Sequence, residues 1–130
     1  MAESPRAGSG SGYRTELVDG WEVLVGKGAR DNDTLTFRVA AASDMWLHAA
    51  GYAGSHVVVR NPDGAEVPRE VIRRAAELAV LHSKARAARG KVDVHVCRVS
   101  DVRKERGAPA GQVRLARWET VRVYSPGAPK

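Results

Sequence analysis

The sequence predicts a single α+β domain with a mostly antiparallel sheet, one long helix and one short helix. Three observations lead to this fold class: several short segments alternate apolar and polar residues like strands, turn-forming residues separate them, and one long segment has the period of an amphipathic helix. The predicted order is strand-strand-helix-strand-strand-helix-strand-strand-strand. This order is typical of an antiparallel sheet with helices packed against it.

The length of the chain, 130 residues, is that of one domain. We expect the folded part to cover residues 13–126, between tails at 1–12 and 127–130. The first tail is small and polar, is predicted to be disordered, and lacks the apolar segment of a secretory signal. No apolar run reaches the roughly 20 residues that a membrane helix needs. We therefore expect a cytoplasmic protein.

The predicted strands are short and bounded by Gly, Pro, Asn or Asp. In order, they are residues 13–18, 21–25, 45–48, 55–60, 92–99, 112–116 and 120–124. Asp19-Gly20 between the first two is a strong signal for a two-residue hairpin turn. The strand at 55–60 contains a continuous apolar run, which indicates a central position in the sheet, and the turn residues at 61–64 end it.

Two segments are predicted to be helical. The first follows the N-cap candidates Asp31-Asn32-Asp33, where the spacing fits a strand as well as a helix, and alanines at 40–42 favour the helix. The second runs from Pro68 to Ala88, because proline suits the first helical position and Gly90 suits a C-terminal stop. Its apolar face is formed by Val71, Ala75, Leu78, Ala79 and His82.

Small aliphatic side chains are expected to dominate the core, because only seven residues are Phe, Trp or Tyr. Cys97 is the only cysteine, so the chain cannot form an internal disulfide. It follows an alternating run of valines at 92, 94 and 96. We therefore predict a buried and unreactive thiol.

Basic charge is concentrated in the second half of the chain. Residues 1–65 hold six Lys or Arg against eight Asp or Glu, a net of −2, whereas residues 66–130 hold 15 against seven, a net of +8. This asymmetry suits a phosphate-rich partner such as nucleic acid. A solvated basic surface, or a protein-interaction module whose basic helix docks on an acidic partner, is the alternative.

The densest group of polar side chains is Asp44, Trp46, His48, Ser55 and His56. Residues two apart in a strand share a face, so the first three are predicted to lie together. One hypothesis is a metal-dependent nuclease or RNA-modifying enzyme with Asp44, His48 and His56 as ligands, although their spacing matches no known metal signature. Ser55 and His56 do not form a nucleophile–base pair, because neighbours in a strand point to opposite faces.

A second hypothesis is that the same group binds single-stranded or looped RNA. Trp46 would be a stacking platform, the histidines would stack or donate hydrogen bonds, and Asp44 would read a base edge. The structural alternative is that Trp46 is a core anchor and Asp44 caps a turn. From residue chemistry alone, this structural interpretation is favoured.

Further basic residues are candidates for phosphate contact. One pair flanks Gly28 in a loop, a second pair lies near the end of the long helix, and a third set lies in the loop at 101–111. In that order they are Lys27 and Arg30, Lys84 and Arg86, and Arg103, Lys104 and Arg106. For the second pair, compensation of the helix dipole is an equal alternative.

An ordered set of motifs across residues 13–126 resembles the RNA-binding module of the NFACT family. The motifs are Gly20–Lys27 (GWEVLVGK), Asn32-Asp33-x-Leu35-Thr36, Asp44–Ala49 (DMWLHA), Gly54–Val58 (GSHVV), Ala75–Arg86, Val102–Val113 and Thr120–Val123. Large members of this family act on stalled large ribosomal subunits, where they recruit transfer RNA and add tails to the nascent chain.

The resemblance implies a non-enzymatic domain that binds transfer or ribosomal RNA and needs no cofactor. The RNA-facing residues that it implies are Lys27, Asn32, Asp44, Trp46, His48, Ser55, His56, Lys84, Arg86, Arg103 and Lys104. We expect a free-standing bacterial version, so tailing activity is not carried over. Ala110 also departs from the family, which tends to have proline there.

Overall fold

The computed structural model describes residues 12–127 and confirms the predicted α+β class. A six-stranded antiparallel sheet has the order β1-β2-β4-β3-β5-β8. Its strands are β1 (Tyr13–Val18), β2 (Trp21–Gly26), β4 (Val57–Val59), β3 (Met45–Ala49), β5 (Val92–Arg98) and β8 (Glu119–Val123). The central position predicted for the apolar strand is confirmed, because β4 lies between β2 and β3.

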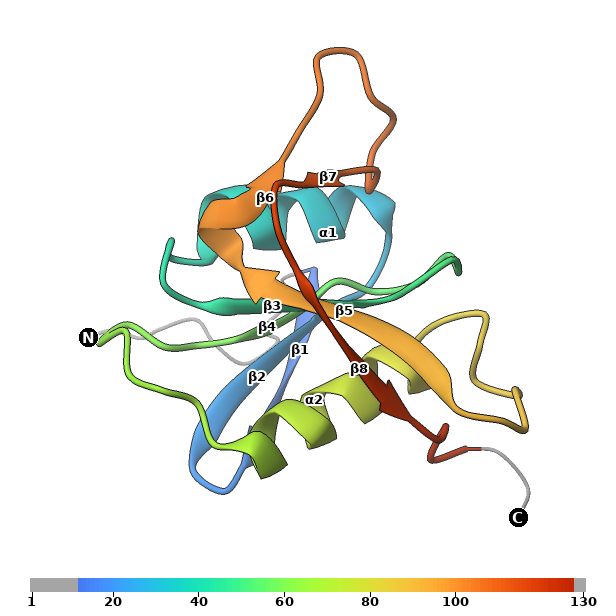
Figure 1. Ribbon diagram of the computed structural model, residues 1–130. Helices are drawn as coiled ribbons and strands as arrows, with labels where there is room; N and C mark the ends of the chain where they lie inside the picture. Colours follow the sequence, from blue (N-terminus) through green and yellow to red (C-terminus); the bar gives the residue numbers. More distant parts are fainter. Residues whose placement is uncertain (1–11, 128–130) are drawn as a thin grey trace.

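The two helices lie on opposite faces of this sheet (Figure 1). The long helix α2 (Arg69–Leu81) covers one face, and α1 (Ala29–Thr34) lies over the other face and continues into the π-helical turn η1 (Leu35–Val39). A 3-10 turn, η2 (Val99–Asp101), leads into a small second sheet formed by β6 (Val102–Arg103) and β7 (Arg114–Leu115).

Alternation along β3 divides the apolar residues into two cores. Leu47 and Ala49 pack in the larger cluster with α2, whereas Trp46 packs on the other face with Leu35 and Val58. The larger cluster consists mainly of Val and Ala, as composition predicted. Cys97 is a buried free thiol in the smaller cluster, and burial raises its pKa to about 12.

The prediction that the long helix extends to Ala88 is wrong, because α2 ends at Leu81. Beyond it, the backbone forms an antiparallel bridge between Ser83 and Gly54. The amide of Ser55 donates to the carbonyl of His82 at 3.0 Å, and the amide of Lys84 donates to the carbonyl of Ala53 at 2.9 Å. These hydrogen bonds to the β3–β4 connection take the place of helical ones, so the residues after Leu81 do not continue the helix.

The predicted short helix is confirmed, but its start is not where the acidic residues indicated. Gly28 occupies the N-cap position without a side-chain cap, and the helix begins at Ala29. The helical segment ends at Val39, since Ala40 has extended backbone angles. The alanines at 40–42 therefore lie outside it.

Two predicted strands are shorter than expected. The strand predicted at 55–60 is reduced to β4, because the amides of Ser55 and His56 donate to groups outside the sheet. The strand predicted at 112–116 is reduced to β7, which pairs with β6 rather than with the main sheet. Among the described residues, no helix combines the length and apolarity needed to span a membrane.

Candidate functional site

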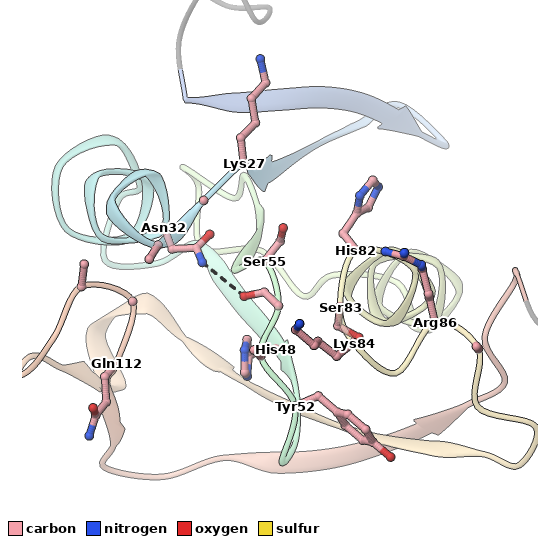
Figure 2. Close-up of a pocket in the computed structure, with 17 residues that line it drawn as sticks. Lys27, Asn32, His48, Tyr52, Ser55, His82, Ser83, Lys84, Arg86 and Gln112 are labelled. Atoms are coloured by element: carbon pink, nitrogen blue, oxygen red, sulfur yellow. Dashed lines mark hydrogen bonds between the residues drawn. The ribbon is translucent and has the colours of Figure 1, made fainter.

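An open cleft of about 790 Å³ lies where the end of β2, the start of α1, the β3–β4 connection and the segment after α2 meet (Figure 2). The cleft brings together six of the candidate residues predicted from the sequence. These six are Lys27, Asn32, His48, Ser55, Lys84 and Arg86. The early end of α2 makes this possible, because the bridge between Ser83 and Gly54 places the residues after the helix beside the β3–β4 connection.

The charge of the cleft is positive. Of the described side chains that line it, Lys27, Lys84 and Arg86 are cations and none is a carboxylate. All three cations are exposed. Figure 2 shows the amine end of Lys84 directed toward Ser55 and His48, whereas Lys27 extends outward from the rim. Three cations without a neighbouring carboxylate in the lining create a positive potential that attracts anions.

Asn32 connects α1 to the floor of the cleft. Its Nδ2 donates to the carbonyl of Gly54 at 3.2 Å, and its Oδ1 accepts from the amide of His56 at 3.0 Å. A side chain at Gly26 has no room, since its Cβ would lie 2.1 Å from Asn32 Oδ1. Ser55 donates through Oγ to the carbonyl of Gly26 at 2.5 Å. Asn32 and Ser55 are therefore positioning residues that hold the cleft walls together.

Trp46 and His56 are buried and do not reach the cleft, with 2% and 1% of their surface exposed. The prediction that they contact RNA directly is therefore wrong. Trp46 Nε1 donates to Thr36 Oγ1 at 3.2 Å, and Thr36 Oγ1 lies 2.9 Å from His56 Nδ1. His56 Nε2 lies 3.2 Å from the carbonyl oxygen of Gly111, which can only accept. The network therefore assigns the proton to Nε2, with Thr36 donating to Nδ1.

The rings of Trp46, His48 and His56 contact one another, and of these three only His48 lines the cleft. Its ring stacks on Trp46, with centroids 5.9 Å apart and planes inclined by 23°. Burial lowers the pKa of His48, the charge of His95 lowers it further, and a backbone hydrogen bond at Gly54 partly offsets both. A neutral imidazole at pH 7 follows, which stacks on or hydrogen-bonds to a ligand without adding charge.

Asp44 has a structural role, and the prediction that it faces RNA is wrong. It is fully buried and lies in the turn before β3, whereas Trp46 and His48 are in the strand. Its carboxylate accepts from the amides of Ala41 at 2.9 Å and Asn61 at 2.6 Å, and Arg60 Nε lies 3.2 Å away. Asp44 thus caps a turn, which was the structural alternative.

The burial of Asp44 also argues against Asp44, His48 and His56 as the ligands of a metal ion. Across residues 12–127, no group of three His, Cys, Asp or Glu side chains is arranged to hold a metal ion. His48 and His56 meet edge to face with ring centroids 5.6 Å apart, but the nitrogens of His56 are engaged by Thr36 and Gly111. The trio of Asp44, His48 and His56 is therefore not a metal centre.

Four other predicted basic residues lie outside the cleft lining, namely Arg30, Arg103, Lys104 and Arg106. Lys104 has a positioning role: its Nζ lies 3.1 Å from Asp33 Oδ2 and donates to the carbonyls of Pro109 at 2.6 Å and Gln112 at 3.0 Å. Asp33 in turn accepts from the amide of Gly111. Lys104 therefore fixes the loop that forms one wall of the cleft. Arg103 is exposed on β6 and Arg30 on α1.

Sequence reasoning missed several residues of the cleft. Tyr52 and Gln112 line it and are exposed, and His82 lines it at the end of α2. Tyr52 carried a usable signal, because an aromatic residue in a polar turn has no core to fill. His82 was assigned to the apolar face of the helix, but it is the C-cap residue of α2 and lines the cleft.

Comparisons with known proteins point to one family. Residues 13–117 match the family described as "NFACT protein RNA binding domain". The chain is 40% identical over 108 residues to the Rqc2 homolog RqcH of Bacillus subtilis, and 29% identical over 90 residues to the ribosome quality control complex subunit NEMF homolog of Drosophila melanogaster. These alignments cover 83% and 69% of this chain but 18% and 9% of the relatives. The chain thus spans less than a fifth of their length.

The fold has also been seen before. The structure of the C-terminal of the fibronectin/fibrinogen-binding protein from Streptococcus suis is similar with a TM-score of 0.79 and 34% sequence identity. The match covers 95% of this chain and 47% of that chain. Fold, motifs and sequence similarity agree with the resemblance seen in the sequence, and the chain belongs to the NFACT RNA-binding domain family.

Proposed function

We propose that this domain is a binding module for structured RNA of the translation machinery, transfer RNA or ribosomal RNA, and that the cleft is its RNA site. Membership of a family described by RNA binding supports the ligand class. The names of its relatives, an Rqc2 homolog and a ribosome quality control complex subunit, support a role near the ribosome. The cleft supplies the chemistry that such a ligand needs.

The convergence of cations is the observation that carries this proposal. Lys27 follows β2, and Lys84 and Arg86 follow α2, so segments far apart in the sequence bring their charges to one cleft. Several cations elsewhere in the described part of the chain are paired with carboxylates, such as Arg73 with Glu70 and Arg122 with Asp93. A positive cleft whose lining lacks carboxylates favours a polyanion.

The remaining groups of the cleft suit a nucleotide rather than a bare anion. Lys84 is placed to contact a phosphate, while His48 presents a neutral ring to the same space. Tyr52 is 42% exposed on the rim, where its ring can stack with an unpaired base. Phosphate contacts would supply affinity, and the aromatic groups would favour looped or unpaired segments.

The test is a fluorescence anisotropy titration of labelled transfer RNA with the wild type and a Lys84→Glu/Arg86→Glu double variant. The matched control is Arg69→Glu/Arg74→Glu, which makes the same charge change at exposed positions of α2 outside the cleft. We expect the cleft variant to bind at least roughly 100-fold more weakly, since each lost phosphate contact is replaced by repulsion. The control should lose far less.

Two outcomes would contradict the proposal. No binding of transfer or ribosomal RNA fragments by the wild type at low salt would exclude the ligand class. Equal losses in the cleft variant and in the α2 control would show that net charge, and not the cleft, determines binding.

A further inference from the structure

We propose that an unpaired RNA base stacks on Trp118, so that the RNA path leaves the cleft and continues across the sheet to the edge strand β8. This inference rests on the proposed function, and it adds a second contact surface and a preference for single-stranded segments. Trp118 lies outside the segment that matches the family, which ends at residue 117.

The indole of Trp118 is placed for contact. Half of its surface, 50%, is exposed, and it belongs to neither of the two core clusters. It directly precedes β8, the edge strand of the main sheet. An exposed tryptophan that packs in no core contributes little to folding and has a large surface available for a ligand.

A row of rings connects Trp118 to the cleft. His95 on β5 contacts Trp118, with ring centroids 5.2 Å apart and planes inclined by 43°. His95 is also directly opposite His48 in the pairing of β5 with β3, so the two imidazoles share one face of the sheet. Because His48 lines the cleft, the row His48, His95, Trp118 leads from the cleft to the sheet edge.

The surroundings of Trp118 favour a nucleotide over an apolar partner. Arg117 precedes it, its side chain is 84% exposed, and its guanidinium lies 3.9 Å from the carboxylate of Asp101. Thr120, two residues after Trp118, is exposed and polar, and the carboxylate of Glu119 belongs to the opposite face of β8 by the alternation of a strand. A single large ring beside an exposed cation fits a base and its phosphate, whereas a protein partner would need a broader apolar patch.

The experiment compares two RNA hairpins with identical stems, one blunt and one with a short single-stranded 3′ extension. Binding is measured by fluorescence anisotropy for the wild type, Trp118→Ala and Trp118→Phe. Leu17→Ala is the matched control, because Leu17 is 73% exposed on the opposite edge strand β1. Circular dichroism confirms that each variant is folded.

The wild type should prefer the extended hairpin by roughly tenfold, a typical gain from one stacked base. Trp118→Ala should lose this preference and bind the blunt hairpin as the wild type does, while Trp118→Phe and Leu17→Ala should retain most of it. An unchanged preference in Trp118→Ala would overturn the inference but leave the proposed function intact. A wild type that binds neither hairpin would overturn both, and one that binds both equally would overturn the inference only.

Discussion

The hydroxyl of Thr36 lies 2.9 Å from Nδ1 of His56 and also accepts the indole N–H of Trp46 at 3.2 Å. This hydroxyl therefore connects two buried rings and fixes the tautomer of the histidine. Nε2 of His56 in turn donates to the carbonyl of Gly111, which belongs to the loop that forms a wall of the cleft. The cleft thus depends on a buried polar network whose side chains lie outside its lining.

Removal of the Thr36 hydroxyl should destabilise the fold. Thr36→Val keeps the shape but leaves a buried donor on Trp46 and a buried acceptor on His56 without partners. The expected loss is about 1–3 kcal/mol in the free energy of unfolding, measured by urea denaturation. Thr15→Val is the matched control, because Thr15 Oγ1 is enclosed without a hydrogen-bond partner among the described residues. A loss in the control as large as in Thr36→Val would contradict this account.

Stability should fall on acidification because His56 is buried. Burial, followed by the charge of His48, lowers the pKa of His56 from 6.5 to about 4. Between pH 6.5 and 4 the unfolded chain therefore binds a proton that the folded chain does not. The free energy of unfolding should decrease as pH falls through this window, by up to about 3 kcal/mol from this residue, and level off below it.

The measurement is urea denaturation at a series of pH values for the wild type and His56→Gln. The variant is less stable at pH 7, but its pH dependence between 6.5 and 4 should be flatter, since it lacks the titrating group. His48 contributes in the same direction, because its pKa is also lowered. Parallel curves for the two proteins would show that His56 is not the source of the acid sensitivity.

Close backbone contact at Gly54 should be essential for the shape of the cleft. A Cβ at Gly54 would lie 2.4 Å from Cβ of Ser83, so Gly54→Ala must separate the two segments that carry Ser55 and Lys84. We expect a lower melting temperature and weaker RNA binding. Gly90→Ala is the control, because a Cβ there meets nothing within 4 Å. Wild-type RNA affinity and stability in Gly54→Ala would contradict the described contact.

The sequence predicted those elements whose signal is local. The hairpin at Asp19-Gly20, the apolar strand β4 and the amphipathic helix α2 were predicted because turn chemistry and periodicity act over a few residues. Asp19 even adopts a positive φ of 49°, as such a turn requires. The burial of Cys97 was also predicted, although it packs in the smaller core, on the opposite face of β5 from Val94 and Val96.

Features set by contacts between distant segments were not predictable. Nothing local to residues 82–88 shows that the backbone of Ser83 pairs with Gly54 and ends α2. An aspartate such as Asp44 is a common ligand-binding residue. Only the hydrogen bonds that it accepts from the amides of Ala41 and Asn61 show that it caps a turn. Motif residues therefore identified the family correctly, while their division into contact and positioning roles required the fold.

The salt dependence of RNA binding tests the central claim most directly. For the wild type and a Lys84→Ala/Arg86→Ala variant, the logarithm of the binding constant for transfer RNA is plotted against the logarithm of salt concentration. If both cations contact phosphates, the variant slope should be shallower by about 1.5, because each contact contributes about 0.7–0.9. An unchanged slope in the variant would contradict the assignment of the cleft as the RNA site.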